Sequence, residues 1–117
     1  MPKAVWNETV IAESDDVEVV DGYSYFPAEA VDRRYLQPSD HRSRCPWKGT
    51  ASYYDVVVHG EVNRAAAWHY ADPSQRAAPL VGGRIGFWRG VKIKAERGHL
   101  SGYRRLSARL ADRSRRR

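Results

Sequence analysis

The chain has 117 residues, of which 42% are hydrophobic and 29% charged, a composition typical of one soluble globular domain. No window approaches the roughly 18 apolar residues of a membrane span, and the N-terminus lacks the apolar segment of a secretory signal. The single cysteine, Cys45, excludes an internal disulfide and a zinc site built from several cysteines. We therefore expect a cytoplasmic protein without a metal or another cofactor.

The basic charge is concentrated at the C-terminal end. Residues 1–90 carry ten Lys and Arg against twelve Asp and Glu, whereas residues 91–117 carry ten against two. The sequence pI near 9.8 therefore reflects the end of the chain and does not indicate a nucleic-acid-binding body. We divide the chain into a β-rich domain over residues 1–97 and a basic segment over residues 98–117. That segment is either a solvated tail or an electrostatic arm for phosphates or an acidic partner.

The N-terminal part of the chain predicts an antiparallel β meander. Short runs of β-branched and aromatic residues alternate with turn residues. The predicted strands are residues 3–6, 9–13, 17–20 and 23–26. Turns are predicted at Asn7–Glu8 and over residues 14–16. Asp21–Gly22 is the strongest hairpin signal, because this pair accepts the positive φ angles of a type I′ turn.

The rest of the domain predicts further strands separated by irregular segments. Pro27 ends a strand and stands near the start of a short helix over residues 28–34. Residues 38–49 have no periodicity and many turn residues, which predicts a loop. Further strands are predicted over residues 52–58, 65–70, 84–89 and 91–94. The predicted fold is mainly β: a small single-domain antiparallel β barrel or tent-like sheet with one short helix.

The basic segment has a different pattern from the domain. Tyr103, Leu106 and Leu110 recur at helical spacing, and four arginines fall on the opposite side, which predicts a basic amphipathic helix. A helix this short is marginal in water unless it docks. Its apolar stripe therefore packs on the β domain, or the segment binds a membrane surface or a nucleic acid.

The segment Cys45–Gly49, with the sequence Cys-Pro-Trp-Lys-Gly, concentrates groups that bind or react. Proline restricts the backbone and glycine lets a ligand approach closely. Lys48 can meet an anion as a point charge, and it can lower the pKa of the Cys45 thiol. The alternative is a structural corner in which Cys45 and Trp47 are core residues and Lys48 is a solvated charge.

Several segments together resemble a widespread bacterial family. They are Lys3–Asn7, Thr9–Ser14, Tyr25–Pro27, Cys45–Tyr54, Ala66–Trp68 and Tyr70. The family is domain-of-unknown-function family 427, which also carries a nucleotidyltransferase-like label, and the resemblance runs from about residue 3 to residue 96. It implies one compact β-rich domain, related to the β-tent folds, with no established activity. Members commonly have Asn-Gly at Asn7–Glu8 and Tyr at His69, so the chain departs from the pattern there.

The transferase label finds little support in the residues. Nucleotidyl transfer usually needs two spaced carboxylates on metal ions, but Asp15, Asp16 and Asp21 lie in predicted turns and Asp-x-Asp never occurs. A phosphate-binding Gly-x-x-x-x-Gly-Lys-Ser/Thr loop is also missing. Relatives among the β-tent folds often hold zinc with paired Cys-x-x-Cys motifs, which a chain with one cysteine cannot form. We assign no catalytic residues from the sequence.

Three functions remain open at this point. The first is a binding module for a small anionic or nucleotide-like molecule, held in a concave apolar pocket with a few polar groups. Its predicted ligand-binding residues are Cys45, Trp47, Lys48, Gly49, Tyr53 and Trp68. The second is an enzyme that uses Cys45 or Lys48. The third is a nucleic-acid or partner adaptor that works through the basic segment, for which we expect weak and non-specific nucleic-acid binding at most.

Overall fold

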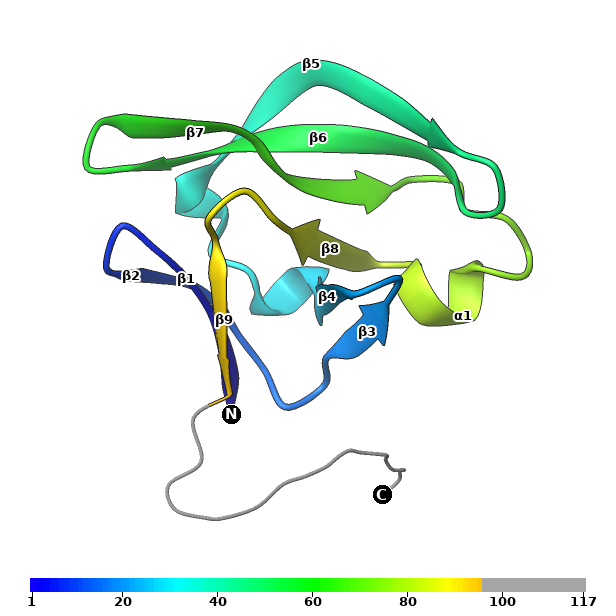
Figure 1. Ribbon diagram of the computed structural model, residues 1–117, viewed down its shortest axis with the longest axis horizontal. Coiled ribbons are helices and arrows are strands. Elements are labelled where there is room, and N and C mark those ends of the chain that lie inside the picture. The colour runs from blue at the N-terminus through cyan, green and yellow to red at the C-terminus, as the bar shows by residue number, and fades with distance from the viewer. Residues whose placement is uncertain (96–117) are drawn as a thin grey trace.

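The computed structural model describes residues 1–95, and in this part of the chain nine strands form two antiparallel sheets (Figure 1). The strands are β1 (Pro2–Trp6), β2 (Thr9–Glu13), β3 (Glu18–Val20), β4 (Tyr23–Pro27), β5 (Leu36–Cys45), β6 (Gly49–Val58), β7 (Glu61–Tyr70), β8 (Arg84–Phe87) and β9 (Lys92–Ala95). The small sheet has the order β2-β1-β9 and the large sheet the order β3-β4-β8-β7-β6-β5. The predicted mainly β fold is confirmed.

Two predicted turns have the expected backbone geometry. Asn7 and Glu8 connect β1 to β2 with φ angles of 51° and 60°. Asp21 and Gly22 connect β3 to β4 with φ angles of 54° and 85°. Two consecutive positive φ angles are the signature of a type I′ turn, whose twist matches that of the flanking strands. The local sequence therefore determined both hairpins.

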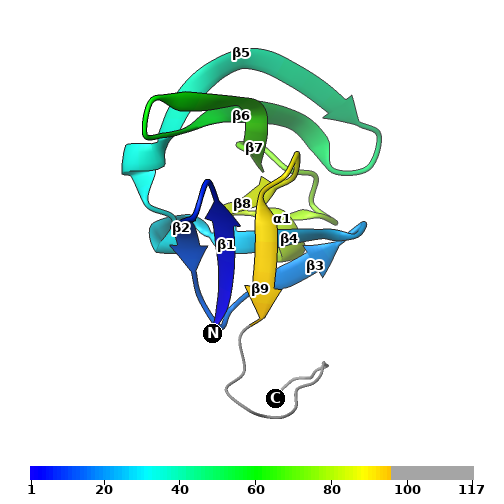
Figure 2. The ribbon, with the colours of Figure 1, turned by 60° about the vertical axis from the view of Figure 1, so that its left-hand side comes forward.

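The large sheet curves strongly but stays open. Its strands β5, β6 and β7 have ten residues each and arch above the small sheet (Figures 1 and 2). Among the described residues, β3 and β5 are the two ends of the strand order, so the sheet does not close into a barrel. The barrel alternative is therefore wrong, and an open curved sheet replaces it.

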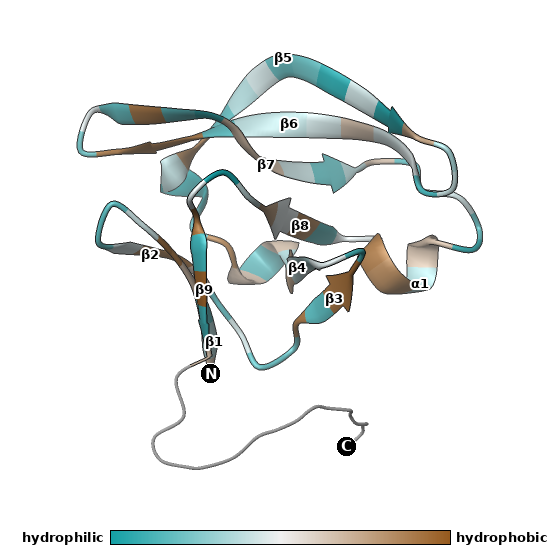
Figure 3. Ribbon diagram, viewed as in Figure 1, coloured by the Kyte–Doolittle hydropathy of each residue, from teal (hydrophilic) through white to brown (hydrophobic). Residues whose placement is uncertain are grey.

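The loop predicted over residues 38–49 is wrong, because most of this segment belongs to strand β5. Proline within a sheet is confined to edge strands, strand ends and bulges, because it cannot donate a hydrogen bond to a neighbouring strand. Pro38 lies exposed on the edge strand, and the pairing with β6 shifts between Pro38 and Arg42. Figure 3 shows the hydrophilic colouring of β5, which matches its mostly exposed side chains. An exposed edge strand lacks the alternating pattern by which strands are recognised.

The helical segments are single turns. The predicted short helix over residues 28–34 is two 3₁₀ turns, η1 (Ala28–Ala30) and η2 (Arg33–Tyr35). Between them Val31 is buried and bridges β2 through Ala12, which interrupts the helix. A further turn, α1 (Ala78–Val81), was not predicted and packs beside β3. No helix within residues 1–95 has the length and apolar character to cross a membrane.

The buried side chains form two clusters. One cluster fills the space between the two sheets and includes Ile11, Phe26, Val56, Ile85 and Phe87. The second cluster includes Val20, Tyr25, Ala51, Tyr53, Ala65, Trp68, Tyr70, Ala77 and Val81. The second cluster is rich in aromatic residues, and its position determines where a site can form. The proposed boundary at residue 97 and the predicted basic helix lie outside the described residues.

Candidate functional site

The Cys-Pro-Trp-Lys-Gly segment forms the connection between β5 and β6 and is tied to the turn that follows β7. Ser74 N–H donates to the Lys48 carbonyl at 3.0 Å, and Ser74 Oγ donates to the Trp47 carbonyl at 2.7 Å. Gly49 has a φ of +118°, and a Cβ there would lie 3.2 Å from the Asp72 carbonyl oxygen. Glycine is required here for both its backbone angle and its lack of a side chain.

Lys48 is buried and forms an ion pair with Asp21 of a second hairpin. Its ammonium donates to Asp21 Oδ2 at 2.5 Å, and the Trp47 indole N–H donates to the same oxygen at 3.3 Å. The hydrogen bond from Lys48 lowers the pKa of Asp21. The ammonium also lies 4.8 Å from the Trp47 ring centre and 5.9 Å from that of Tyr70. Lys48 is 5% exposed, so its charge is compensated inside the protein.

Cys45 lies next to this ion pair and has a perturbed thiol. Burial raises the pKa of the thiol, but hydrogen bonds from the backbone amides of Trp47 and Lys48 and from the Lys48 ammonium outweigh it, so the pKa is lowered. Within residues 1–95 no hydrogen bond joins Cys45 to a histidine. The ring centre of His41 lies 4.5 Å from that of Tyr53 instead. A Cys–His nucleophile is therefore not assembled in this part of the chain.

Four aromatic side chains gather on the same side of the large sheet, and we call them the aromatic face: Tyr23, Tyr53, Trp68 and Trp88. The Trp68 ring centre lies 5.2 Å from that of Tyr23, 6.0 Å from that of Tyr53 and 5.5 Å from that of Trp88. Trp68 is 5% exposed, whereas Tyr23 is 38% exposed. The aromatic face is therefore an apolar surface with a buried centre and an accessible rim.

Strand pairing and one glycine position the centre of the aromatic face. Tyr53 and Trp68 are direct partners in the β6–β7 register, so their side chains lie on the same side. Gly86 is the partner of Trp68 on β8. A Cβ at Gly86 would lie 2.8 Å from Trp68 Cζ2 and 3.0 Å from Tyr25 Cε2. Trp68 occupies the space that Gly86 leaves, and its indole N–H donates to the Tyr25 hydroxyl at 3.2 Å.

Polar and charged groups border the aromatic face. The Arg89 guanidinium lies 4.6 Å from the Trp88 ring centre, and the Trp88 indole N–H donates to the Ala65 carbonyl at 2.6 Å. The Tyr53 hydroxyl shares a hydrogen bond of 2.8 Å with Ser43 Oγ. Cationic and hydroxyl groups therefore stand at the edge of the apolar surface.

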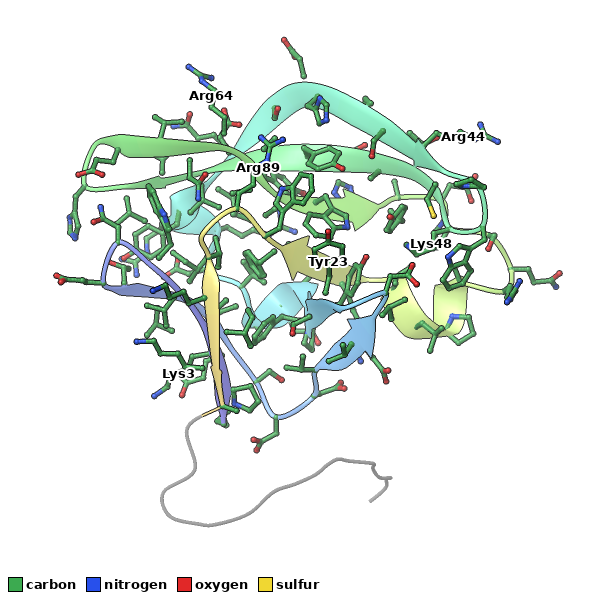
Figure 4. All side chains as sticks on the ribbon, viewed as in Figure 1. Lys3, Tyr23, Arg44, Lys48, Arg64 and Arg89 are labelled. Carbon is green, nitrogen blue, oxygen red and sulfur yellow. The ribbon has the colours of Figure 1, made fainter. Side chains whose placement is uncertain are left out.

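The labelled side chains separate into two groups in space. Tyr23, Lys48 and Arg89 lie over the interior of the large sheet, whereas Arg44 and Arg64 point outward from the strands (Figure 4). Lys3 belongs to the small sheet. Of these labelled cations, Lys48 is paired with Asp21, whereas Arg89 lies over the Trp88 ring.

The structure brings four of the six predicted ligand-binding residues together at one aromatic cluster. Tyr53 and Trp68 are in the aromatic cluster, and Cys45 and Trp47 pack against it. Lys48 and Gly49 belong to the same hairpin. Sequence reasoning missed Tyr23, Trp88 and Asp21. Tyr23 follows the predicted Asp21–Gly22 turn and Trp88 stands in a predicted strand, but no local signal shows which strands become neighbours.

The described residues do not form a metal centre. No group of three or more His, Cys, Asp or Glu side chains within residues 1–95 is arranged to hold a metal ion. The site is therefore built from aromatic rings, hydroxyl groups and cations.

These features define a β protein with two antiparallel sheets, of which the larger carries an aromatic face beside the ion pair of Lys48 and Asp21. The chain belongs to the family described as a domain of unknown function, DUF427, which matches residues 3–98. The family resemblance seen in the sequence is confirmed. A comparison with curated proteins finds no match.

Proposed function

We propose that the protein is a binding module for a small anionic ligand with a planar aromatic ring, such as a nucleotide, and that the ring docks on the aromatic face. The observation that carries this proposal is the cluster of Tyr23, Tyr53 and Trp88 around Trp68, with Tyr23 38% exposed. Four segments distant in sequence supply these rings. Stacking of a nucleobase on an aromatic side chain contributes about 1–3 kcal/mol per base.

Arg89 supports an anionic ligand. It lies over the Trp88 ring, and among the described residues no carboxylate forms an ion pair with it. Its positive charge is therefore available to a phosphate or carboxylate attached to the docked ring. It also disfavours a cationic ligand, because the Arg89 guanidinium already occupies the electrostatically attractive position at Trp88.

The Cys-Pro-Trp-Lys-Gly hairpin supports the site from one side. The Lys48 ammonium is paired with Asp21, to which the Trp47 indole also donates, so we assign Lys48 the role of holding Trp47 and the two hairpins together. Cys45, Trp47 and Gly49 border the aromatic cluster in this arrangement. The primary anion contact is therefore Arg89.

The experiment is a titration followed by NMR amide shifts and tryptophan fluorescence. We expect AMP to bind more tightly than adenosine or inorganic phosphate alone, because only AMP engages both the rings and Arg89. Tyr23→Ala is expected to weaken AMP binding at least tenfold, which is about 1.4 kcal/mol, while Arg89→Gln removes the preference for AMP over adenosine. Val62→Ala is the matched control, since Val62 is an exposed apolar residue elsewhere on the large sheet.

Two results contradict the proposal. One is the absence of saturable shifts with purine and pyrimidine nucleotides. The other is equal AMP affinity in Tyr23→Ala and Val62→Ala. Tight binding of tetramethylammonium would also contradict it, because this would indicate a cation site.

An enzyme that uses Cys45 is the second candidate function, and the lowered pKa of the thiol favours it. The amides of Trp47 and Lys48 and the Lys48 ammonium stabilise a thiolate, which is the nucleophilic form. An activated acyl ester tests this function, since attack by the thiolate forms a thioester at Cys45 and releases the alcohol. An adduct at Cys45 seen by mass spectrometry, formed faster than on unfolded protein, supports an enzyme; equal rates count against it.

A further inference from the structure

A small pocket lies on the other side of the large sheet from the aromatic face. Successive side chains of a strand point to opposite sides, so Tyr54 and His69 face away from their neighbours Tyr53 and Trp68. The pocket has a volume of about 120 Å³, and its lining residues with polar or charged side chains are Arg33, Tyr54, His69, Tyr70 and Arg84. This volume is well below the roughly 300–1,000 Å³ of sites that enclose larger organic ligands. Its size suits a small ion.

Arg33 provides a positive charge that the described part of the chain does not neutralise. Its guanidinium donates to the Tyr54 hydroxyl at 3.2 Å and lies 5.6 Å from the Tyr54 ring centre. No carboxylate forms an ion pair with Arg33 within residues 1–95. The neighbouring Arg34 is paired with Asp32 at 2.6 Å. Of these two adjacent arginines, Arg34 is paired with a carboxylate, and Arg33, which is not, lines the pocket.

Arg84, the other cation that lines the pocket, already has a carboxylate partner. The Arg84 guanidinium forms an ion pair with Asp16 at 2.8 Å and donates to the Asp16 carbonyl. Arg84 therefore adds little net charge and instead holds one wall of the pocket in place. The positive charge that can attract an anion into the pocket is therefore that of Arg33.

His69 adds a second unsatisfied group. Its ring is stacked on Tyr54 with the centres 5.3 Å apart, and its buried Nδ1 has no hydrogen-bond partner among the described residues. Buried polar atoms without a partner are rare in folded proteins. Burial lowers the pKa of His69, and the charges of Arg33 and Arg42 lower it further. The imidazole is therefore neutral near neutral pH and stands in a positive field.

We propose that this pocket binds a small oxyanion, such as phosphate or sulfate, held by the Arg33 guanidinium and the Tyr54 hydroxyl. Arginine presents several N–H donors in a planar fork that suits oxyanions. The Tyr54 hydroxyl accepts a hydrogen bond from Arg33, which leaves its own proton to donate to the anion. The two groups that hold the anion, Arg33 and Tyr54, are not among the four rings of the aromatic face, so the two sites can be tested separately.

A bound anion also acts on His69. The charged groups that face its ring are Arg33 from η2, Arg42 from β5 and Arg84 with its partner Asp16, and Tyr54 of β6 stacks on it. An oxyanion opposes the field of the arginines, so it raises the pKa of His69 and the imidazole takes up a proton. Binding therefore strengthens as the pH falls through this raised value.

The experiment follows the histidine side chains by NMR as a function of pH, in sulfate and in chloride at equal ionic strength. Sulfate is the first probe because it does not titrate in this range. We expect saturating sulfate to raise the pKa of His69 by about one unit or more, equivalent to about 1.4 kcal/mol. Unchanged titration of His69 in sulfate would overturn the coupling.

Matched charge variants test the site itself. Arg33→Gln is expected to weaken sulfate binding at least tenfold, and Arg44→Gln, which removes the same charge from an outward-pointing side chain, is expected to leave it unchanged. His69→Gln is expected to retain binding and lose its pH dependence. Equal losses in Arg33→Gln and Arg44→Gln would show a general charge effect and overturn the proposal, as would the absence of saturable shifts.

Inorganic phosphate and methyl phosphate identify the source of the anion. Both carry the oxyanion that the pocket recognises. Similar affinity for the two supports a site for the phosphate group of a larger molecule, and a strong preference for inorganic phosphate supports a site for the free ion. Failure to bind either one contradicts the proposal, and leaves the function proposed for the aromatic face unaffected.

Discussion

The ammonium of Lys48 and the carboxylate of Asp21 are 2.5 Å apart, and they join two hairpins whose turns are separated by 27 residues. The Lys48 side chain is 7% exposed, whereas that of Asp21 is 53% exposed. Removal of one partner of an ion pair strongly lowers the stability of the folded protein when the remaining charge is buried, but has little effect when water solvates that charge. Loss of Asp21 is therefore expected to destabilise the protein more than loss of Lys48.

This asymmetry predicts the order of two substitutions. Asp21→Asn tolerates the positive φ of the turn but leaves the buried ammonium without a counter-charge, so we expect a clear loss of stability. Lys48→Met keeps an apolar stem and leaves a carboxylate that water solvates, so we expect a loss of about 1 kcal/mol or less. Urea unfolding of wild type and both variants measures the two losses of unfolding free energy, which can then be compared. A larger loss in Lys48→Met would contradict the asymmetry.

The same pair predicts a dependence of stability on acid pH. The hydrogen bond from Lys48 lowers the pKa of Asp21 below its usual value of 3.8. The stabilisation is therefore fully present above pH 3.8 and is lost as the pH falls through the lower value of the folded protein. We expect the difference in unfolding free energy between wild type and Asp21→Asn to shrink in that range. A constant difference would show that the pair contributes nothing through its charge.

Cys45 is expected to react as a thiolate at a lower pH than an ordinary cysteine. Its lowered pKa depends on the amides of Trp47 and Lys48 and on the Lys48 ammonium. Lys48→Met removes the cation and is expected to raise the pKa of the thiol, since the amides remain. The pKa of the thiol is measured in wild type and in Lys48→Met from the absorbance of the thiolate as a function of pH. Identical curves would mean that the ammonium does not act on Cys45.

Gly86→Ala is expected to disturb the centre of the aromatic face. The added methyl group would lie 2.8 Å from Trp68 Cζ2, so the indole must shift in a packed environment. Overpacking of this kind costs about 1–3 kcal/mol. We expect a lower unfolding midpoint and changed Trp fluorescence. Adding Trp68→Phe provides the control, because a smaller ring relieves the clash; strictly additive losses would show that the two positions do not interact.

Removal of residues 98–117 tests the adaptor hypothesis. It deletes seven Arg and one Asp and leaves every described strand intact, since β9 ends at Ala95. We expect lower stability, because the predicted apolar stripe loses its contact with the domain, and negligible DNA binding in both forms at physiological salt. Fluorescence anisotropy with labelled DNA measures the binding. Sub-micromolar affinity that vanishes on truncation would support the adaptor.

The positions of the turns and most strands follow from the sequence alone. Asp21–Gly22 carries the conformational preference of a type I′ turn, and Asn7 carries part of it in the first hairpin, where Glu8 also adopts a positive φ. The strand over residues 52–58 is recognisable because most of its side chains are β-branched or aromatic. The Cys45–Gly49 segment likewise stands out by composition, which is why the candidate residues on this hairpin were found.

Only the tertiary structure shows which of these strands and turns pair with or contact one another. Residues 38–45 form a strand only because β6 offers them a paired edge, and their polar sequence carries no sign of it. Asp21 becomes the partner of Lys48, and Trp68 the centre of four rings, through strand pairings between segments distant in sequence. Local residues set local geometry, whereas the closeness of distant side chains depends on the register and curvature of the whole sheet.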